Sequence, residues 1–344
     1  CNSVVIFDEV QALPVRCMEL FHLAVNFLSQ FCNTTVILCS ATQPSLAKLE
    51  ENNIVDCPEM AGDAERYAEV FKRVEIIDKT KSIPGGMLID DLKNFVLDQF
   101  EKCTSVLVIV NTKETAKLLY EAVKTVWDKG ETIYHLSTNM CPQNRRDELY
   151  AIKLGLKERK KIFGVSTQLI EAGVNFSFEC VIRSLSGLDS IIQAAGRCNR
   201  HGEQENLGKV YIVKLSPDIE RTDKLQEIEK AQEACERLLY EFQEQKEKFD
   251  YALDSQLAIK RYYQLYYHEL GSEITKYPVS KSEEWNTKNE VLKRALEGTN
   301  LVDLLGKNDI GRNQYRRDHV GKHQQPLLSQ AFKTAGEYLS LIHI

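Results

Sequence analysis

The stretch Val106–Thr112, with the sequence VLVIVNT, decides the fold class of this chain. Its first five residues are all apolar, which is typical of a strand buried on both faces of a parallel sheet. The polar residues Asn111 and Thr112 follow at its tip, and a helical pattern then extends from Glu114 to Lys124. The stretch therefore predicts one strand-turn-helix unit of an α/β fold.

The same pattern recurs on both sides of this unit. Downstream and just upstream of it, strands are expected at Val74–Ile77, Ile133–Leu136, Ile162–Val165, Cys180–Ser184 and Val210–Leu215. Nearer the N-terminus, apolar strands at Val4–Phe7 and Thr35–Leu38 flank a helical stretch from about Pro14 to Phe31, and a helix is expected from Ser45 to Glu51. Because strands and helices alternate, the sequence predicts parallel sheets with helices on both faces.

The chain divides into three expected regions. Residues 1–70 would form the C-terminal part of one α/β lobe, residues 71–215 a complete second lobe, and residues 216–344 a helical accessory region. In the last region Lys224–Phe249 and Leu253–Leu270 read as amphipathic helices, and no strand pattern returns. The chain opens on a central strand and closes on Ser340–Ile344, which resembles translated sequencing adaptor, so the sequence predicts truncation at the N-terminus and an artificial C-terminus.

Composition argues against several classes of protein. Of the 344 residues, 43% are hydrophobic and 27% charged, the balance of a globular rather than a disordered protein. No apolar run is long enough to span a bilayer and no signal pattern opens the chain, so we expect a cytoplasmic location and no membrane partner. The ten cysteines are scattered without a C-x-x-C pair, which argues against a zinc site. A net charge of -6 argues against coating of nucleic acid, but not against a local groove of donors.

Two polar segments follow the strands of the first lobe. Asp8 and Glu9 come directly after a strand, where Asp8 could hold a magnesium ion and Glu9 could activate a water molecule. Read alone, such an acidic pair is better explained by a solvated loop. Ser40–Thr42 follows the second strand, and read alone its hydroxyls would cap the next helix. The two signals in this order strengthen one another.

Two similar segments lie in the second lobe. Asn111 and Thr112 could donate to a phosphate group, and capping of the helix by Thr112 explains them equally well. Val165–Val174, with the sequence VSTQLIEAGV, has the same strand-turn-helix layout. Because Gly173 would end that helix after one or two turns, the segment favours a binding role over a packing role.

The segment Gln193–Arg200, with the sequence QAAGRCNR, carries the strongest chemical signal. In a helix, Gln193, Arg197 and Arg200 would share one face. Two guanidinium groups on one face repel each other unless an anion lies opposite. A pair of surface arginines bound to carboxylates is the alternative for an isolated R-x-x-R, but the flanking glutamine and glycine favour a functional site.

These segments resemble the motifs of a known helicase group. D-E-V-Q at residues 8–11, S-A-T at residues 40–42, the VSTQLIEAGV segment and Q-A-A-G-R-C-N-R resemble motifs II, III, V and VI of superfamily 2 helicases, in that order. More narrowly, T-Q-L-I-E-A-G-V, S-L-S-G-L-D-S-I-I-Q-A-A-G-R-C-N-R-H-G-E, A-I-K-R-Y-Y-Q-L-Y-Y-H-E-L and Q-A-F-K-T-A-G-E are similar to the CRISPR-associated helicase-nuclease of type I systems, especially its type I-C branch.

The resemblance implies two RecA-like lobes that close on ATP and Mg²⁺. By position it would assign Asp8 to the magnesium ion, Glu9 to the attacking water, and Arg197 and Arg200 to the γ-phosphate. Gln193, Gly173 and Asn175 would contact the nucleotide, Thr112 and Thr167 would hold DNA phosphates, and Gln11, Ser40 and Thr42 would couple the two sites. It also implies a monomeric motor that pulls the displaced single DNA strand, recruitment by the RNA-guided Cascade complex, and an upstream HD nuclease.

The sequence departs from this family in three ways. No G-x-x-x-x-G-K-[ST] loop occurs, so the chain as written is expected to hydrolyse no ATP. There is no His-Asp dipeptide for the nuclease. Asn175 stands where many superfamily members have an aspartate, which predicts a softened contact to the nucleotide sugar.

Two alternatives stay open. One is another superfamily 2 DNA or RNA helicase, although the H-G-E after Arg200 and the Y-Y-Q-L-Y-Y stretch have no general helicase rationale. The other is a non-catalytic remnant that binds single-stranded DNA or a partner protein. The tyrosines of Y-Y-Q-L-Y-Y fit a core or an interface better than a base-stacking platform.

Overall fold

A computed structural model gives the fold of the chain as two α/β units, which confirms the predicted fold class. Unit 1 comprises Cys1–Cys39, Leu46–Cys57 and Gly271–Ile344, and unit 2 comprises Ser40–Ser45 and Pro58–Leu270. The structure describes residues 3–14, 17–40, 42, 54, 57–58, 60, 72–127, 132–137, 140–170, 175–223 and 225–271. The expected helix Ser45–Glu51 lies outside these residues.

In its described residues, unit 1 contains a two-stranded parallel sheet with one long helix packed on it. Strand β1 (Val4–Phe7) pairs in parallel with β2 (Thr35–Leu38), and α1 (Met18–Phe31) connects them. The side chains of Val10, Phe21 and Val25 form the centre of the small core. Helix α1 begins at Met18 and not at Pro14, because a short 3-10 helix (Val10–Ala12) and a turn at Pro14 precede it.

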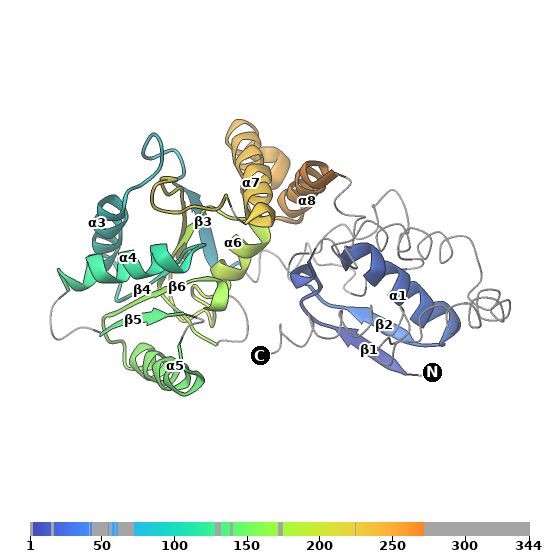
Figure 1. Ribbon diagram of the computed structural model, residues 1–344, viewed down its shortest axis with the longest axis horizontal. Helices are drawn as coiled ribbons and strands as arrows, with labels where there is room; N and C mark the ends of the chain where they lie inside the picture. The colour runs from blue at the N-terminus through green and yellow to red at the C-terminus, as the bar shows by residue number, and fades with distance from the viewer. Residues whose placement is uncertain are drawn as a thin grey trace, which may run out of the picture. The chain divides into compact units, whose positions relative to one another are not determined.

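Unit 2 is built on a six-stranded sheet in which every pair of neighbours is parallel (Figure 1). The strand order is β3-β8-β7-β4-β6-β5, which places β4 and β7 in the middle. The strands are β3 (Val74–Asp78), β4 (Ser105–Ile109), β5 (Thr132–Leu136), β6 (Ile162–Ser166), β7 (Cys180–Ser184) and β8 (Gly208–Val213). All six predicted strands are confirmed, with ends shifted by two residues at most.

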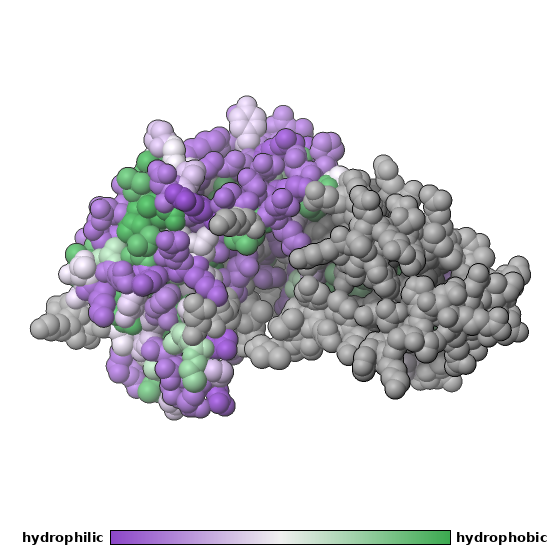
Figure 2. All heavy atoms as spheres, viewed as in Figure 1, coloured by the Kyte–Doolittle hydropathy of each residue, from purple (hydrophilic) through white to green (hydrophobic). Residues whose placement is uncertain are grey.

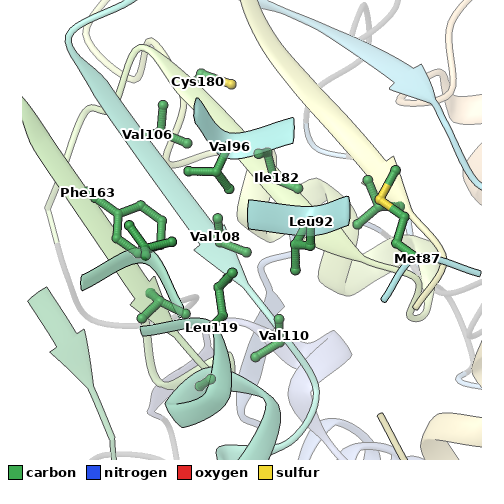
Figure 3. Close-up of a cluster of buried hydrophobic side chains, with 14 of the residues drawn as sticks. Met87, Leu92, Val96, Val106, Val108, Val110, Leu119, Phe163, Cys180 and Ile182 are labelled. Carbon is green, nitrogen blue, oxygen red and sulfur yellow. The ribbon is translucent and has the colours of Figure 1, made fainter. Parts of the chain in front are cut away.

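Helices cover both faces of this sheet because its central strands are apolar on both sides. Helices α3 (Ile89–Phe100) and α4 (Lys113–Lys124) pack on one face, where Val106, Val108 and Val110 gather with Leu92 and Leu119 (Figure 3). Helices α5 (Pro142–Lys157) and α6 (Leu188–Ala195) contribute to the opposite core, which contains Leu107 and Ile109. The alternation along β4 thus supplies both cores of the unit.

Two further helices follow the sheet and belong to unit 2. Helix α7 (Gln226–Glu244) and α8 (Gln256–Leu270) pack against each other, and α8 also contacts α6. The prediction of one continuous helix from Lys224 to Phe249 is wrong. The helix ends at Glu244, and a separate 3-10 helix, η5 (Lys246–Phe249), follows before left-handed residues Asp250 and Tyr251 turn the chain toward α8.

The aromatic face of α8 is internal. Tyr262, Tyr263 and Tyr266 are buried, and the rings of Tyr262 and Tyr266 stack with centroids 5.7 Å apart. Of the two roles expected for the tyrosines of this stretch, core or interface, these three have the core role. On the visible face of unit 2 most of the surface is hydrophilic (Figure 2). Among the helices within the described ranges, none has the length and apolar character needed to cross a membrane.

Candidate functional site

The first predicted site segment lies at the carboxyl end of β1, in unit 1. Asp8 and Glu9 are both exposed, and the Glu9 amide donates to Asp8 Oδ1 over 3.0 Å. Glu9 has a left-handed backbone with φ of 55°, which costs about 1–2 kcal/mol for a residue with a Cβ atom. The Gln11 side-chain amide donates to Glu9 Oε2. The two carboxylates and Gln11 therefore form one polar group at the strand tip.

The Ser40–Thr42 segment follows β2, whose end is joined to β1 by a bond from the Cys39 amide to the Phe7 carbonyl. The Thr42 amide donates to Ser40 Oγ over 3.2 Å, so the serine hydroxyl closes a tight turn. Thr42 is buried within unit 2, and its Oγ1 lies 3.3 Å from the hydroxyl oxygen of Tyr263 in the same unit. The segment is thus held by its own hydroxyls and by α8.

The tip of β4 has a structural explanation in unit 2. The Thr112 side chain caps α4, because the Thr115 amide donates to Thr112 Oγ1 over 3.2 Å. Asn111 is buried, and its amide and Nδ2 donate to the two carboxylate oxygens of Glu220 over 2.7 Å and 2.9 Å. Of the two interpretations of this segment, capping is therefore observed. The Asn111 donors are directed at an internal carboxylate.

A buried polar cluster surrounds that carboxylate. Ser184 Oγ donates to Glu220 over 3.2 Å. Arg183 is fully buried and donates to the carbonyls of Ile109 and Ser184, to Ser184 Oγ, and to Ser190 Oγ over 2.9 Å. The sequence did not point to this cluster, because Glu220 lies in a connector far along the chain from Asn111 and Arg183 sits inside an apolar strand.

Glu220 provides a test of this cluster through pH. Burial raises the pKa of the Glu220 carboxyl above its ordinary value of 4.5, although the Asn111 amide and the charge of Arg183 oppose the shift. An acid whose pKa is raised by folding binds more protons in the folded state. Its contribution to stability is therefore lost as pH rises from about 4.5 through the folded-state pKa. We expect Glu220→Gln to gain stability relative to wild type across this window.

The measurement is urea unfolding of both proteins from about pH 4 to pH 8. Loss of a hydrogen bond in the variant changes the free energy of unfolding by an amount that does not depend on pH. The result is therefore the pH dependence of the difference in unfolding free energy between the two proteins. Glu101→Gln, at an exposed carboxylate, is the matched control and should show a flat difference. A flat difference for Glu220→Gln as well would contradict the raised pKa.

The second predicted binding segment of unit 2 follows β6. Thr167 is buried at the strand end, and a 3-10 helix, η4 (Gln168–Ile170), comes next. Ser166 Oγ donates to the Leu136 carbonyl over 3.1 Å, which joins the ends of β6 and β5. Asn175 is exposed. Gly173 lies outside the described residues.

The Gln193–Arg200 segment departs from its predicted geometry. Helix α6 ends at Ala195, so Gln193 is helical but Arg197 and Arg200 are not, and the prediction that all three share one helix face is wrong. The chain leaves the helix because Cys198 pairs in parallel with Phe178, just ahead of β7. Asn199 then adopts a left-handed backbone with φ of 44°, a conformation that asparagine tolerates better than most residues.

Asn199 also holds the loop that carries Arg200. Its Nδ2 donates to the Arg73 carbonyl over 3.0 Å, and its Oδ1 accepts from the Gln204 amide over 3.2 Å. The Arg200 amide donates to Ser177 Oγ over 3.0 Å. Sequence reasoning did not assign a role to Asn199. Its position between the two arginines was the available signal.

The two arginines have different surroundings. Arg197 is buried, and its Nε donates to the Ile170 carbonyl of η4 over 2.8 Å. Arg200 is half-buried, and its side chain donates to the Gly196 carbonyl over a long 3.4 Å. Arg197 therefore connects the segment after β6 to the segment after α6. Arg200 retains donors for another acceptor.

Comparison with known proteins finds similarity to CRISPR-associated nuclease/helicases of the Cas3 type. Residues 102–203 match the family model for the C-terminal part of CRISPR-associated nuclease/helicase Cas3. A relative from Methanocaldococcus jannaschii, a Cas3-type CRISPR-associated nuclease/helicase, is 27% identical over 223 residues, which cover 62% of this chain. This chain spans only 29% of the length of that relative.

Solved structures show the same fold. The crystal structure of T. fusca Cas3 with AMPPNP has a TM-score of 0.58 at 16% identity and covers 86% of this chain and 38% of that one. A chain in the pre-nicking structure of a CRISPR RNA-guided surveillance complex has a TM-score of 0.56 at 15% identity, over 86% of this chain and 40% of that one. The parallel sheets with helices on both faces therefore match the RecA-like lobes of a Cas3 helicase.

Proposed function

We propose that this chain is the motor region of a CRISPR-associated helicase of the Cas3 type, which uses ATP hydrolysis to move along single-stranded DNA. One observation carries the proposal: Arg197 Nε donates to the Ile170 carbonyl, which joins the segment that would hold DNA to the segment that would reach ATP. A motor needs such a connection, because the state of the nucleotide must change the grip on the strand.

The residues at β1 fit a magnesium ion. Mg²⁺ prefers carboxylate oxygens, and Asp8 and Glu9 present theirs at the exposed end of a parallel strand, where α/β sheets bind ligands. Asp8 would hold the ion, which supplies charge stabilisation to the phosphates when bound. Glu9 would orient the attacking water and accept its proton. Gln11, with its bond to Glu9, would couple this group to the DNA grip together with Ser40 and Thr42.

The residues of unit 2 would stabilise the transferred phosphoryl group and hold the strand. Arg200 would donate to the γ-phosphate. Arg197, buried against η4, would shift with the position of the γ-phosphate. Gln193, Asn175 and Gly173 would contact the nucleotide. Thr167 would hold a DNA phosphate. Thr112 would do so by donating its hydroxyl proton, which would have to leave the hydroxyl oxygen of Thr115, 2.7 Å away.

The biological setting belongs to the same proposal. The motor would act in the cytoplasm as a monomer, pull the displaced strand of the target DNA, and be recruited by an RNA-guided Cascade complex in antiviral defence. The support is the likeness to a chain in an RNA-guided surveillance complex. The type I-C assignment rests on the sequence segments quoted above.

The test is DNA-stimulated ATP hydrolysis by a longer protein that contains this chain and an upstream phosphate-binding loop. Wild type should hydrolyse ATP when single-stranded DNA is added, and Glu9→Gln should lower kcat about 100-fold or more because the general base is lost. The chain alone, without the loop, should hydrolyse no ATP.

The matched control is Glu101→Gln, which removes an exposed carboxylate from the turn after α3 and should leave kcat unchanged. DNA binding measured by fluorescence anisotropy should be the same for all three proteins. Absence of hydrolysis in the longer wild-type protein, combined with normal DNA binding, would instead favour the non-catalytic module.

A further inference from the structure

The N-terminus of α6 is contacted by α7 and α8, the two helices that follow the sheet. The Tyr262 hydroxyl of α8 donates to Asp189 Oδ1, in the first turn of α6, over 3.1 Å. Tyr262 is only 1% exposed, so this bond is shielded from water. Burial raises the pKa of the Asp189 carboxyl, while the bond from Tyr262 lowers it. A shielded bond of this kind defines a position more strictly than a surface contact does.

Gly187 gives independent evidence for the tightness of this contact. It is the residue before α6, and a Cβ atom built on it would lie 2.3 Å from both Asp189 Oδ1 and the Tyr262 hydroxyl oxygen. The bond therefore passes directly over the backbone of Gly187. Only a residue without a side chain allows α8 to approach the start of α6 this closely.

Helix α7 holds the same segment at a second point. The Gln232 side-chain amide donates to the Leu185 carbonyl over 2.8 Å, between β7 and α6. Ala231 of α7 would also contact a Cβ atom at Gly187, at 3.3 Å. Both helices of the pair thus bear on residues 185–189, which lead into the Gln193–Arg200 segment.

We propose that Tyr262 is a positioning residue for the Gln193–Arg200 segment, acting through its bond to Asp189. Helix α6 is eight residues long, or about 12 Å at 1.5 Å per residue, so it transmits a shift of one end to the other as a rigid body. Its far end leads into Arg197, which is bonded to Ile170. Helices α7 and α8 therefore set the positions of Arg197 and Arg200. This role rests on the proposed function.

The test uses Tyr262→Phe, which removes the hydroxyl and keeps the ring. Tyr266→Phe, on the same buried face and stacked on Tyr262, is the matched control. Gly187→Ala disturbs the same hydrogen bond by placing a methyl group beside it, and it leaves Tyr262 in place. Hydrogen exchange is measured on this chain, and DNA-stimulated ATP hydrolysis is measured on the longer protein with its phosphate-binding loop.

For Tyr262→Phe we expect about tenfold faster exchange of the α6 amides, with α4 unchanged, and a kcat about tenfold lower. The KM for ATP should change less than about twofold, because the bond acts on the geometry of the arginines and not on ground-state binding. Gly187→Ala should show the same split, and Tyr266→Phe should match wild type. A merely structural role would raise exchange throughout unit 2 and leave the kcat of the folded fraction unchanged.

Two outcomes overturn the inference and are distinguishable. If the longer wild-type protein hydrolyses ATP and Tyr262→Phe has the wild-type kcat, the positioning role is wrong while the proposed function stands. If the longer wild-type protein hydrolyses no ATP, the proposed function fails and the positioning role fails with it. In that case the exchange of the α6 amides still reports whether the bond fixes the helix.

Discussion

Replacement of Arg200 by alanine is expected to lower kcat for DNA-stimulated ATP hydrolysis about 1,000-fold or more, because a guanidinium that neutralises the transferred phosphoryl group contributes on this scale. The loop should survive the change. Its backbone is held by bonds from the Arg200 amide to Ser177 and from Asn199 to Arg73, and none of these uses the Arg200 side chain. Binding of single-stranded DNA should therefore be retained.

The measurement is steady-state hydrolysis by the longer protein with its phosphate-binding loop, beside DNA binding by anisotropy. Arg200→Lys separates charge from geometry, because a lysine keeps the charge but cannot present the planar fork of donors. Arg221→Ala, at an exposed arginine, serves as control. Turnover of Arg200→Ala at the wild-type rate would exclude the arginine-finger role, whatever the result for lysine.

Arg183→Met should destabilise unit 2 by about 3–5 kcal/mol, because it removes a buried cation and leaves its neighbours uncompensated. The carboxyl groups of Asp189 and Glu220 both lie within the electrostatic reach of Arg183. The carbonyls of Ile109 and Ser184 would also lose a donor. At about 2–4 °C per kcal/mol for a unit of this size, the melting temperature should fall by about 6–20 °C.

Thermal unfolding followed by circular dichroism measures this effect directly. Arg221→Met makes the same chemical change at an exposed site and should shift the melting temperature by less than about 2 °C. A shift equally small for Arg183→Met would mean that the buried cluster is not stabilised by the arginine charge. Because the readout is thermal unfolding and not ATP hydrolysis or DNA binding, the test is independent of the proposed function.

The strands of unit 2 could be predicted from the sequence because each carries its own signal. The run Val106–Val110 is apolar on both faces and must be buried on both faces, whatever its neighbours are. The helix ends after α6 and α7 could not be predicted in the same way. Gly196 is a poor helix former, but the exact end of α6 also depends on the pairing of Cys198 with Phe178, and that pairing is set by the tertiary fold.

The candidate site shows the same division. Motif order predicts site roles for Arg197 and Arg200, but local spacing predicts a shared helix face that the structure does not have. At the tip of β4 the sequence left capping and phosphate binding open. In the structure the donors of Asn111 are bound by the carboxylate of Glu220, which comes from another part of the chain. Pairings between residues so far apart leave no trace in a single sequence.

The connector and helices that follow β8 bear on how such a protein can change over evolutionary time. Glu220, Gln232 and Tyr262 each complete a bond that begins inside the sheet region, at Asn111, Leu185 and Asp189 respectively. Recombination that exchanged everything after β8 for an unrelated sequence would remove these three bonds from buried groups. We therefore expect the sheet of unit 2 and the helices after it to be inherited as a single block, and new binding specificities to arise at loops rather than by replacement of these helices.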